Sequence, residues 1–314
     1  MLPSADYSPE KIALPTVSWG ECLIKRPIRR FAYPLYNALM SRWLRHRYGD
    51  LGLEADQWLW GQRGNDFERQ RSRVNHFLPL RGKDIVVAGC GTGRDVPSWL
   101  TFHPGTLTGV DYFSYARMWS ALTQHFHAQY PTNRVEFCQA DLTALDKFSD
   151  ASVDVIGSDA VFEHVRDLPA VLKEFHRILR PGGVVYATYG PLWHCWGGDH
   201  ISGSDQLHHG YNHLLLAREA YEKYLDELGE YAHSEHDGRT WIKHGLFSYL
   251  RPLQYLQLLE AAGFGRLFVG AIIEPRAIQC LTERPDLRAQ LVAENSSLDL
   301  IVTGMTIIYQ KRFV

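Results

Sequence analysis

The chain lacks several features that mark whole classes of protein. No apolar stretch approaches the roughly twenty residues that a membrane-spanning helix needs. The N-terminal residues lack the basic segment and following apolar segment of a secretory signal peptide. Neither sign of charge dominates, because 33 Lys and Arg face 35 Asp and Glu, a formal net charge of −2. This balance argues against nucleic-acid binding by the whole molecule. We expect no transmembrane segment and no nucleic-acid partner.

Cysteine is scarce as well. The five cysteines are odd in number and none stands in a C-x-x-C pair; they are Cys22, Cys90, Cys138, Cys195 and Cys280. This usage is typical of a reducing cytoplasm and predicts no zinc–cysteine cluster. We therefore expect a cytoplasmic protein.

What the chain does have is ordinary globular composition at substantial length. Its 314 residues are 45% hydrophobic and 22% charged, enough for one large α/β domain with additions. We predict an N-terminal arm and helical cap over residues 1–80, followed by a core domain over residues 81–314. Within the core domain, residues 190–246 form an insertion, which we interpret as an acceptor lid.

An apolar run that leads into glycines is the most informative feature. Residues 85–88 read Ile-Val-Val-Ala, typical of a buried parallel strand, and Gly89-Cys90-Gly91-Thr92-Gly93 follows at once. Glycines at alternate positions let the chain turn sharply and bring its backbone against a ligand. Asp111 ends the next strand, where an acid can accept hydrogen bonds from a ribose. Together these residues predict a nucleoside-binding crevice.

The glycine spacing separates the candidate nucleosides. A dinucleotide site needs G-x-G-x-x-G, but Arg94 stands where the third glycine should be. The phosphate loop G-x-x-x-x-G-K-[ST] is absent too. A nicotinamide oxidoreductase is thus disfavoured.

Five segments in order resemble the class I S-adenosylmethionine-dependent methyltransferases. The first four are the glycine loop, Thr108-Gly109-Val110-Asp111-Tyr112, the strand ending in Ala140-Asp141-Leu142, and residues 153–160. The fifth consists of two signatures, Phe162-Glu163-His164-Val165 and then Leu179-Arg180-Pro181-Gly182-Gly183. The resemblance implies a Rossmann-like, doubly wound sheet of seven mostly parallel strands, the last one antiparallel. It also implies S-adenosyl-L-methionine as the cofactor.

The resemblance implies cofactor-binding residues one by one. Asp111 would hold the ribose hydroxyls and Asp141 the adenine amino group. The full predicted set is Gly89, Cys90, Gly91, Gly93, Asp111, Tyr112, Asp141, Leu142 and Asp159. One position departs from the family, because Val87 stands where an acid usually supports the methionine end. A non-catalytic S-adenosylmethionine-binding protein is therefore an alternative.

Downstream, the pattern predicts the remaining elements. Apolar residues recur at helical spacing from Leu168 to Leu179, with Asp167 as N-cap. The strand at 184–189 is followed by roughly fifty residues, a length that suits a lid better than a simple connection. We further expect a strand at 266–273, a short helical segment around 277–293 and a last strand at 298–310.

Histidines gather just after the strand at 184–189. His200 is our first candidate for a general base and His194 the second, with Asp199 as an orienting partner, because imidazole titrates near working pH. Trp193 and Trp196 are candidates for the acceptor wall or for the core. We interpret Glu163 and His164 as structural. Imidazole and carboxylate suit divalent ions, yet no ligand spacing supports a site, so we predict no metal.

Residues 25–48 are basic and aromatic, with seven Lys or Arg and no Asp or Glu. We interpret this stretch as a cap helix that packs an apolar stripe on the core and solvates its arginines. Contact with an anionic acceptor or a membrane surface is the alternative.

These observations predict methyl transfer from S-adenosyl-L-methionine to a small-molecule acceptor. The histidines favour a hydroxyl acceptor, since a hydroxyl must lose its proton. Methylation of a membrane-associated or anionic acceptor is the rival enzymatic interpretation. The sequence is compatible with a homo-oligomer.

Overall fold

The computed structural model describes residues 67–228 and 238–312, together with residues 57–60 and the helical residues Leu39, Arg42 and His46. The predictions for the N-terminal arm and for the basic stretch 25–48 lie outside the described residues, apart from those three. Within the described part, no helix is both long and apolar enough to cross a bilayer.

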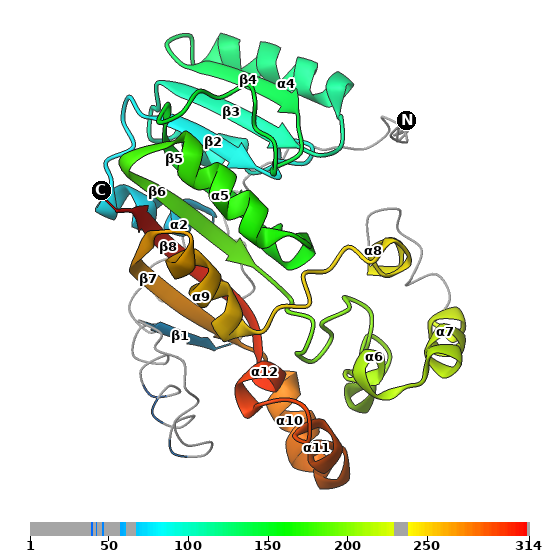
Figure 1. The fold of residues 1–314 in the computed structure, drawn as a ribbon. Coiled ribbons are helices and arrows are strands. Elements are labelled where there is room, and N and C mark those ends of the chain that lie inside the picture. Colours follow the sequence, from blue (N-terminus) through cyan, green and yellow to red (C-terminus); the bar gives the residue numbers. More distant parts are fainter. Residues whose placement is uncertain are drawn as a thin grey trace, which may run out of the picture.

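An eight-stranded sheet forms the centre of the molecule (Figure 1). Its strands are β1 (Gln57–Trp60), β2 (Asp84–Ala88), β3 (Thr106–Asp111), β4 (Arg134–Gln139), β5 (Val153–Asp159), β6 (Leu179–Tyr189), β7 (Phe264–Ile273) and β8 (Val302–Lys311). They lie in the order β1-β7-β8-β6-β5-β2-β3-β4. β8 runs antiparallel to both its neighbours, while the other pairs are parallel. The predicted doubly wound sheet with an antiparallel last strand is confirmed.

Two boundaries differ from the prediction. Residues 1–80 were expected to form an arm and a helical cap, but β1 lies within them and pairs in parallel with β7, from Gln57 with Gly270 to Trp60 with Ile273. A four-residue strand is too short to show a period of its own. The last strand was expected from residue 298, where the structure has helix α12 (Ser297–Ile301) instead. Ser296 begins this helix, because its Oγ accepts from the Asp299 N–H and the Asp299 carboxylate accepts from the Ser296 N–H.

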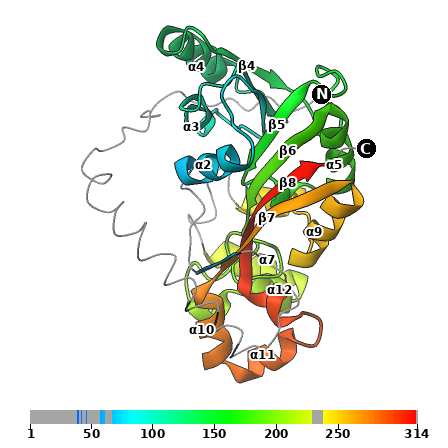
Figure 2. The same ribbon diagram turned by 90° about the vertical axis from the view of Figure 1, so that its left-hand side faces the viewer.

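Helices cover both faces of the sheet (Figure 2). α5 (Leu168–Ile178) and α9 (Pro252–Ala261) lie on one face. α2 (Phe67–Phe77), α3 (Val96–Leu100) and α4 (Ala116–Gln129) belong to the other. Side chains of β6 alternate between the two cores, because successive residues of a strand point to opposite faces.

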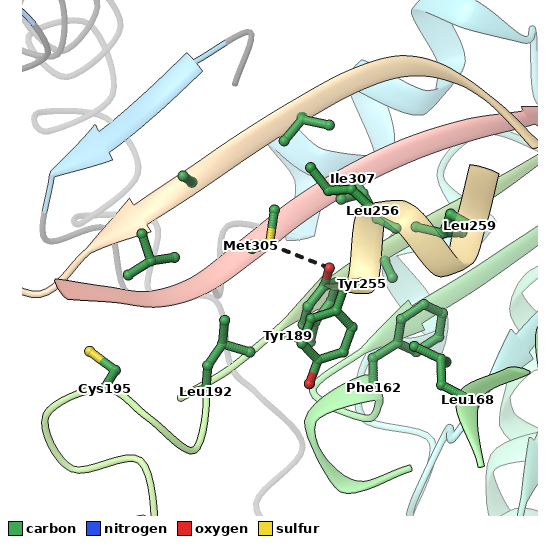
Figure 3. Close-up of a cluster of buried hydrophobic side chains, with 14 of the residues drawn as sticks. Phe162, Leu168, Tyr189, Leu192, Cys195, Tyr255, Leu256, Leu259, Met305 and Ile307 are labelled. Carbon is green, nitrogen blue, oxygen red and sulfur yellow. Dashed lines mark hydrogen bonds between the residues drawn. The ribbon is translucent and has the colours of Figure 1, made fainter. Parts of the chain in front are cut away.

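The predicted helix after β5 is confirmed as α5, and Asp167 caps it by accepting from the Ala170 N–H at 3.0 Å. The core beneath α5 and α9 contains Phe162, Tyr189 and Tyr255 side by side (Figure 3). The Tyr189 hydroxyl donates to the Met305 sulfur at 3.6 Å. This packing fixes the ends of β5 and β6, from which the site is built.

Two helical segments extend beyond the carboxyl ends of strands (Figure 1). After β6 come η2 (Leu207–His209), α6 (Asn212–Leu215), α7 (Arg218–Glu227) and α8 (Gly238–His244). After β7 come α10 (Pro275–Glu283) and α11 (Pro285–Leu291), ahead of α12. The segment predicted around 277–293 is thus two helices, which separate at Pro285 because proline cannot continue a helix.

Candidate functional site

The strand order places a ligand crevice between β2 and β5. The chain passes from β2 to its neighbour β3, then to β4, and returns to β5 on the other side of β2. In open α/β sheets, ligands bind outside the carboxyl ends of the strands at such a switch point. The two loops touch there, since a Cβ on Gly89 would lie only 2.2 Å from Val161 Cγ2. Residues after β2 and after β5 therefore share one site.

The glycine loop after β2 packs against the protein at Gly93 and has free space beside Gly91. Gly89, Gly91 and Gly93 all have positive φ, at 72°, 52° and 93°. A Cβ on Gly93 would lie 2.6 Å from Leu122, whereas a Cβ on Gly91 would meet nothing within 4 Å. Only glycine adopts these conformations without strain. The backbone at Gly91 is thus exposed to whatever enters the crevice.

Asp111 lies at the end of β3 and holds this loop. Its Oδ2 accepts from the Gly91 N–H at 2.7 Å and its Oδ1 from the Phe113 N–H at 2.9 Å. Burial raises the pKa of this carboxyl, although the backbone donors work in the opposite direction. Tyr112 and Phe113 beside it are 46% and 40% exposed. A carboxylate flanked by exposed rings fits the sugar and base of a nucleoside.

The other residues predicted from the same strands lie close by. Cys90 is buried, and burial raises the pKa of its thiol, so it packs and does not react. The Ala140 N–H donates to the Asp111 carbonyl at 2.9 Å, which brings the end of β4 against Asp111. Asp141 follows, exposed, with Oδ1 accepting from the Thr143 N–H and hydroxyl, and Leu142 is buried. The structure therefore gathers the predicted nucleoside-binding residues at one edge.

Asp159, at the end of β5, belongs to a buried charged cluster. It forms a bidentate pair with Arg71 of α2, at 3.2 and 2.5 Å, and accepts from the Tyr186 hydroxyl at 2.7 Å. Asp95 lies 3.6 Å from the same guanidinium. Burial and the Asp159 charge raise the pKa of Asp95 to about 7. A direct role of Asp159 toward a cofactor stays a prediction.

Arg71 and Asp95 were missed by the sequence interpretation. Asp95 stands two residues after Gly93, which could have drawn attention to it. Arg71 gives no sequence signal, because nothing in its helix distinguishes it from the neighbouring Arg69 and Arg73.

Glu163 joins the loop after β5 to both ends of the insertion. Its Oε1 accepts from the Gly190 N–H at 3.0 Å, and its main-chain carbonyl accepts from the Ser248 N–H at 2.8 Å. The side chain is buried, and this burial raises its pKa to about 8. Among the described residues, Oε2 has no hydrogen-bond partner.

His164 and His200 meet in an aromatic cluster beside this loop. Their rings stack at 5.1 Å between centroids. Trp241 contacts both, at 4.2 and 4.6 Å, and Phe247 lies 5.5 and 5.8 Å from them. Burial lowers the pKa of His164, so its ring is neutral near pH 7. The first candidate base thus lies next to the loop after β5.

His194 lies in a different environment. Its Nε2 is 3.3 Å from the Tyr249 carbonyl oxygen. Burial and the Arg251 charge lower its pKa. Its Nδ1 is buried. The contacts of His194 therefore direct it toward Tyr249 and Arg251, not toward the His164–His200 pair.

Asp199 is held by several donors of the insertion. It accepts from the Ile201 and Ser202 N–H groups, the Ser202 hydroxyl and the Tyr221 hydroxyl. His213 Nδ1 lies 3.8 Å away. Although burial raises the pKa of Asp199, His213 and the hydroxyl donors lower it overall. These contacts tie Asp199 to its own loop and to α7, and its role as an orienting partner of a candidate base stays a prediction.

The described residues contain no group of three or more His, Cys, Asp or Glu side chains placed to hold a metal ion. Imidazoles and carboxylates in the insertion are instead distributed over separate contacts. His208 pairs with Glu283 and His209 with Asp205.

Comparison with known proteins agrees with this geometry. Residues 86–187, from β2 to near the end of β6, match the family model described as a methyltransferase domain. The chain contains a methyltransferase domain. The prediction of a class I S-adenosylmethionine-dependent methyltransferase is thereby confirmed at the level of the domain family.

Individual relatives resemble this methyltransferase domain over part of their length. A probable S-adenosylmethionine-dependent methyltransferase of Mycolicibacterium smegmatis is 36% identical over 103 residues, 33% of this chain and 36% of that protein. Trans-aconitate 2-methyltransferase of Deinococcus radiodurans is 32% identical over 180 residues, 57% of each. The chain thus spans between about a third and six tenths of the length of these relatives. Among solved structures, a putative sarcosine dimethylglycine methyltransferase from Galdieria sulphuraria has a TM-score of 0.49 at 14% identity and covers 78% of this chain and 85% of that one.

Proposed function

We propose that the whole chain transfers a methyl group from S-adenosyl-L-methionine to a small molecule. The single observation that carries the proposal is the pairing of Asp111 with the open glycine loop at the switch point. The loop offers backbone at Gly91, Asp111 offers carboxylate lone pairs to a sugar diol, and Tyr112 and Phe113 offer exposed rings. These residues fit an adenosine. When bound, S-adenosylmethionine supplies an electrophilic methyl group at a sulfonium centre.

The methionine end would lie toward β5. Val87, where the family usually has an acid, is fully buried within β2 and cannot contact a ligand. The cluster of Asp159, Asp95 and Arg71 carries two carboxylates against one guanidinium. A cationic ammonium group would balance that charge. This supports binding despite the departure at Val87.

For the acceptor we propose a hydroxyl group whose proton passes to a histidine. The geometry supports the His200 neighbourhood over His194, because His200 stacks on His164 at the loop after β5. The aromatic rings of Trp241 and Phe247 around this pair exclude water and offer flat apolar surface to a small acceptor. A positioned histidine base contributes about 10²–10⁴-fold to such a reaction. We propose the cytoplasm as its compartment, since the four described cysteines are free thiols.

The test measures methyl transfer from radiolabelled S-adenosylmethionine by the full chain to catechol, 4-hydroxybenzoate, trans-aconitate and ethanolamine. Methylation of catechol or 4-hydroxybenzoate at oxygen is the expected result. Methylation of trans-aconitate alone would contradict the hydroxyl acceptor, since a carboxylate needs no base. Cofactor binding with no methylated product from any acceptor would favour the non-catalytic alternative.

A further inference from the structure

A short segment crosses the loop after β5 and fixes its side chains. Residues 244–248, here called the strap, connect α8 to α9. Four hydrogen bonds join the strap to residues 163–166: Arg166 Nη2 to the His244 carbonyl at 3.3 Å, Arg166 Nε to the Gly245 carbonyl at 2.6 Å, His164 Nδ1 to the Leu246 carbonyl at 2.8 Å, and the Ser248 N–H to the Glu163 carbonyl at 2.8 Å. The strap therefore holds this loop in one arrangement.

The contact with Leu246 determines which nitrogen of His164 carries the proton. A carbonyl oxygen only accepts hydrogen bonds, so Nδ1 of His164 must be the donor. In a neutral imidazole the lone pair then lies on Nε2. Within the part of the chain that the structure describes, the His164 side chain makes no other hydrogen bond. The strap thus presents Nε2 as a free proton acceptor.

Burial lowers the pKa of this ring, so it is neutral, and the loop that carries it contacts the glycine loop. The groups stacked on it are the rings of His200, Trp241 and Phe247, none of which carries a carboxylate. His164 comes three residues after Val161, which contacts the glycine loop at Gly89. Its two main charged neighbours in the chain, Glu163 and Arg166, are engaged with Gly190 and with the strap.

Backbone strain gathers in the same region. Ala160, His200 and Tyr249 are three of the five described non-glycine residues with positive φ, at 57°, 69° and 55°. Ala160 follows β5 directly, His200 stacks on His164, and Tyr249 follows the strap directly. Such conformations are unfavourable for residues other than glycine and persist where the surroundings enforce them, often at functional sites.

We propose that His164 is the general base of the methyl transfer and that the Leu246 carbonyl, through the strap, selects Nε2 as the proton acceptor. The inference deepens the proposed function and rests on it. In the proposed step, Nε2 accepts the proton of the acceptor hydroxyl while that oxygen forms its bond to the transferred methyl carbon. The electron pair of the broken carbon–sulfur bond leaves with the sulfur, and the imidazolium later gives its proton to water. The earlier interpretation of His164 as structural is replaced by this proposal.

The first arm of the test needs no acceptor. Nitrogen NMR of the full chain labelled with ¹⁵N-histidine, with and without S-adenosylhomocysteine, reports the tautomer of each imidazole. The His164 signal is assigned by its loss in His164→Asn. We expect a neutral ring protonated at Nδ1 at pH 7.5. A ring protonated at Nε2, or a doubly protonated ring, overturns the proposal.

The second arm separates the base from the strap. Asn at position 164 can still donate to the Leu246 carbonyl but has no atom at the place of Nε2, whereas Phe retains a ring and loses both functions. For His164→Asn we expect S-adenosylhomocysteine affinity within about twofold of wild type, unchanged amide exchange over residues 245–248, and single-turnover transfer slowed about 10²–10⁴-fold. For His164→Phe we expect faster exchange in the strap as well. The matched control is His208→Asn, which changes an exposed histidine of the insertion paired with Glu283.

The two proposals fail in different ways. If wild type methylates catechol or 4-hydroxybenzoate at oxygen and His164→Asn does so at the wild-type rate, the assignment of the base is wrong while the proposed function stands. If wild type methylates none of them, the proposed function is wrong and the base with it.

Discussion

The Asp111 carboxylate has enough lone pairs for two tasks. In the structure its two oxygens accept from Gly91 and Phe113 and so shape the glycine loop. Each carboxylate oxygen has two lone pairs, which leaves capacity for the hydroxyls of a ribose. Asp111 therefore shapes the loop and can also accept the hydrogen bonds that we propose from a ribose.

Replacing Asp111 by Asn should weaken S-adenosylhomocysteine binding roughly 10- to 100-fold, because hydrogen bonds to a charged group contribute about 1.5–3 kcal/mol. Titration calorimetry measures the change. Asp146→Asn, at an exposed position between β4 and β5, is the control and should bind as wild type does. Equal affinity for all three proteins would show that Asp111 does not contact the ligand.

Glu163 should make stability depend on pH in a defined direction. Its pKa of about 8 in the folded protein exceeds the ordinary 4.5, so the native state binds more protons between these values. This contribution is complete below pH 4.5 and is lost as pH rises through 8, by at most about 1.4 kcal/mol per pH unit. Urea unfolding of wild type and Glu163→Gln from pH 5 to 8 should therefore show the wild type losing stability relative to the variant.

Glu174→Gln serves as the control for this titration. Pairing with Arg177 lowers the pKa of Glu174, so this group has no titration between pH 5 and 8. Its stability should run parallel to wild type over that range. Parallel curves for Glu163→Gln would mean that Glu163 is ionised in the folded state.

At the residue scale, sequence reasoning works where chemistry depends on local spacing. The glycines and Asp111 follow directly after apolar strands, so their place at the sheet edge could be predicted. The contacts of Asp199 could not be predicted, since its partner Tyr221 is 22 positions away on a helix of the insertion. The tautomer of His164 depends on a carbonyl 82 positions away, which no local pattern reveals.

At the scale of elements, the contact between the loops after β2 and β5 is the critical one. Gly89 and Gly82 share φ of 72°, but a Cβ would strike Val161 only at Gly89. Both replacements by Ala incur the left-handed strain of about 1–2 kcal/mol. Only Gly89→Ala adds an overlap worth about 1–3 kcal/mol more and displaces the loop after β5.

Gly89→Ala should therefore unfold at lower urea than Gly82→Ala and lose S-adenosylhomocysteine binding, while Gly82→Ala binds normally. Chemical denaturation and calorimetry on the two variants test this. Equal behaviour of the pair would contradict the contact between the two loops.

A second prediction at the scale of elements concerns the hydrogen bonds that hold the strap. Arg166→Ala removes two of the four hydrogen bonds that hold it. We expect faster amide exchange over residues 245–248, because local opening needs less free energy when fewer contacts oppose it. Arg218→Ala, which breaks an exposed pair with Glu222 on α7, is the control. Unchanged exchange in Arg166→Ala would show that other contacts hold the strap.

Elements with a long, clear period were predictable, and short ones were not. α5 and the buried strands β2, β3 and β5 follow from apolar patterns that persist over the whole element. β1 has four residues and gains its definition from pairing with β7. α12 precedes β8 because of its capping box, although the apolar run from residue 298 reads equally well as strand.

For the molecule as a whole, the order of strands in the sheet determines which residues meet at the site. The reversal of strand order between the parallel neighbours β2 and β5 places the glycine loop, Asp111, Glu163 and His164 at one edge. The insertion returns to the same edge through the strap. Its length could be predicted from sequence, but its internal contacts could not, since they depend on pairs such as His208 with Glu283.

The most direct test of this arrangement is a crystal structure of the full chain with S-adenosylhomocysteine bound. The account predicts the adenosine against the backbone of Gly91, with its ribose hydroxyls on the Asp111 carboxylate and its sulfur toward the loop of Glu163 and His164. A ligand bound away from Asp111, or the same crevice filled by a dinucleotide in competition, would contradict it.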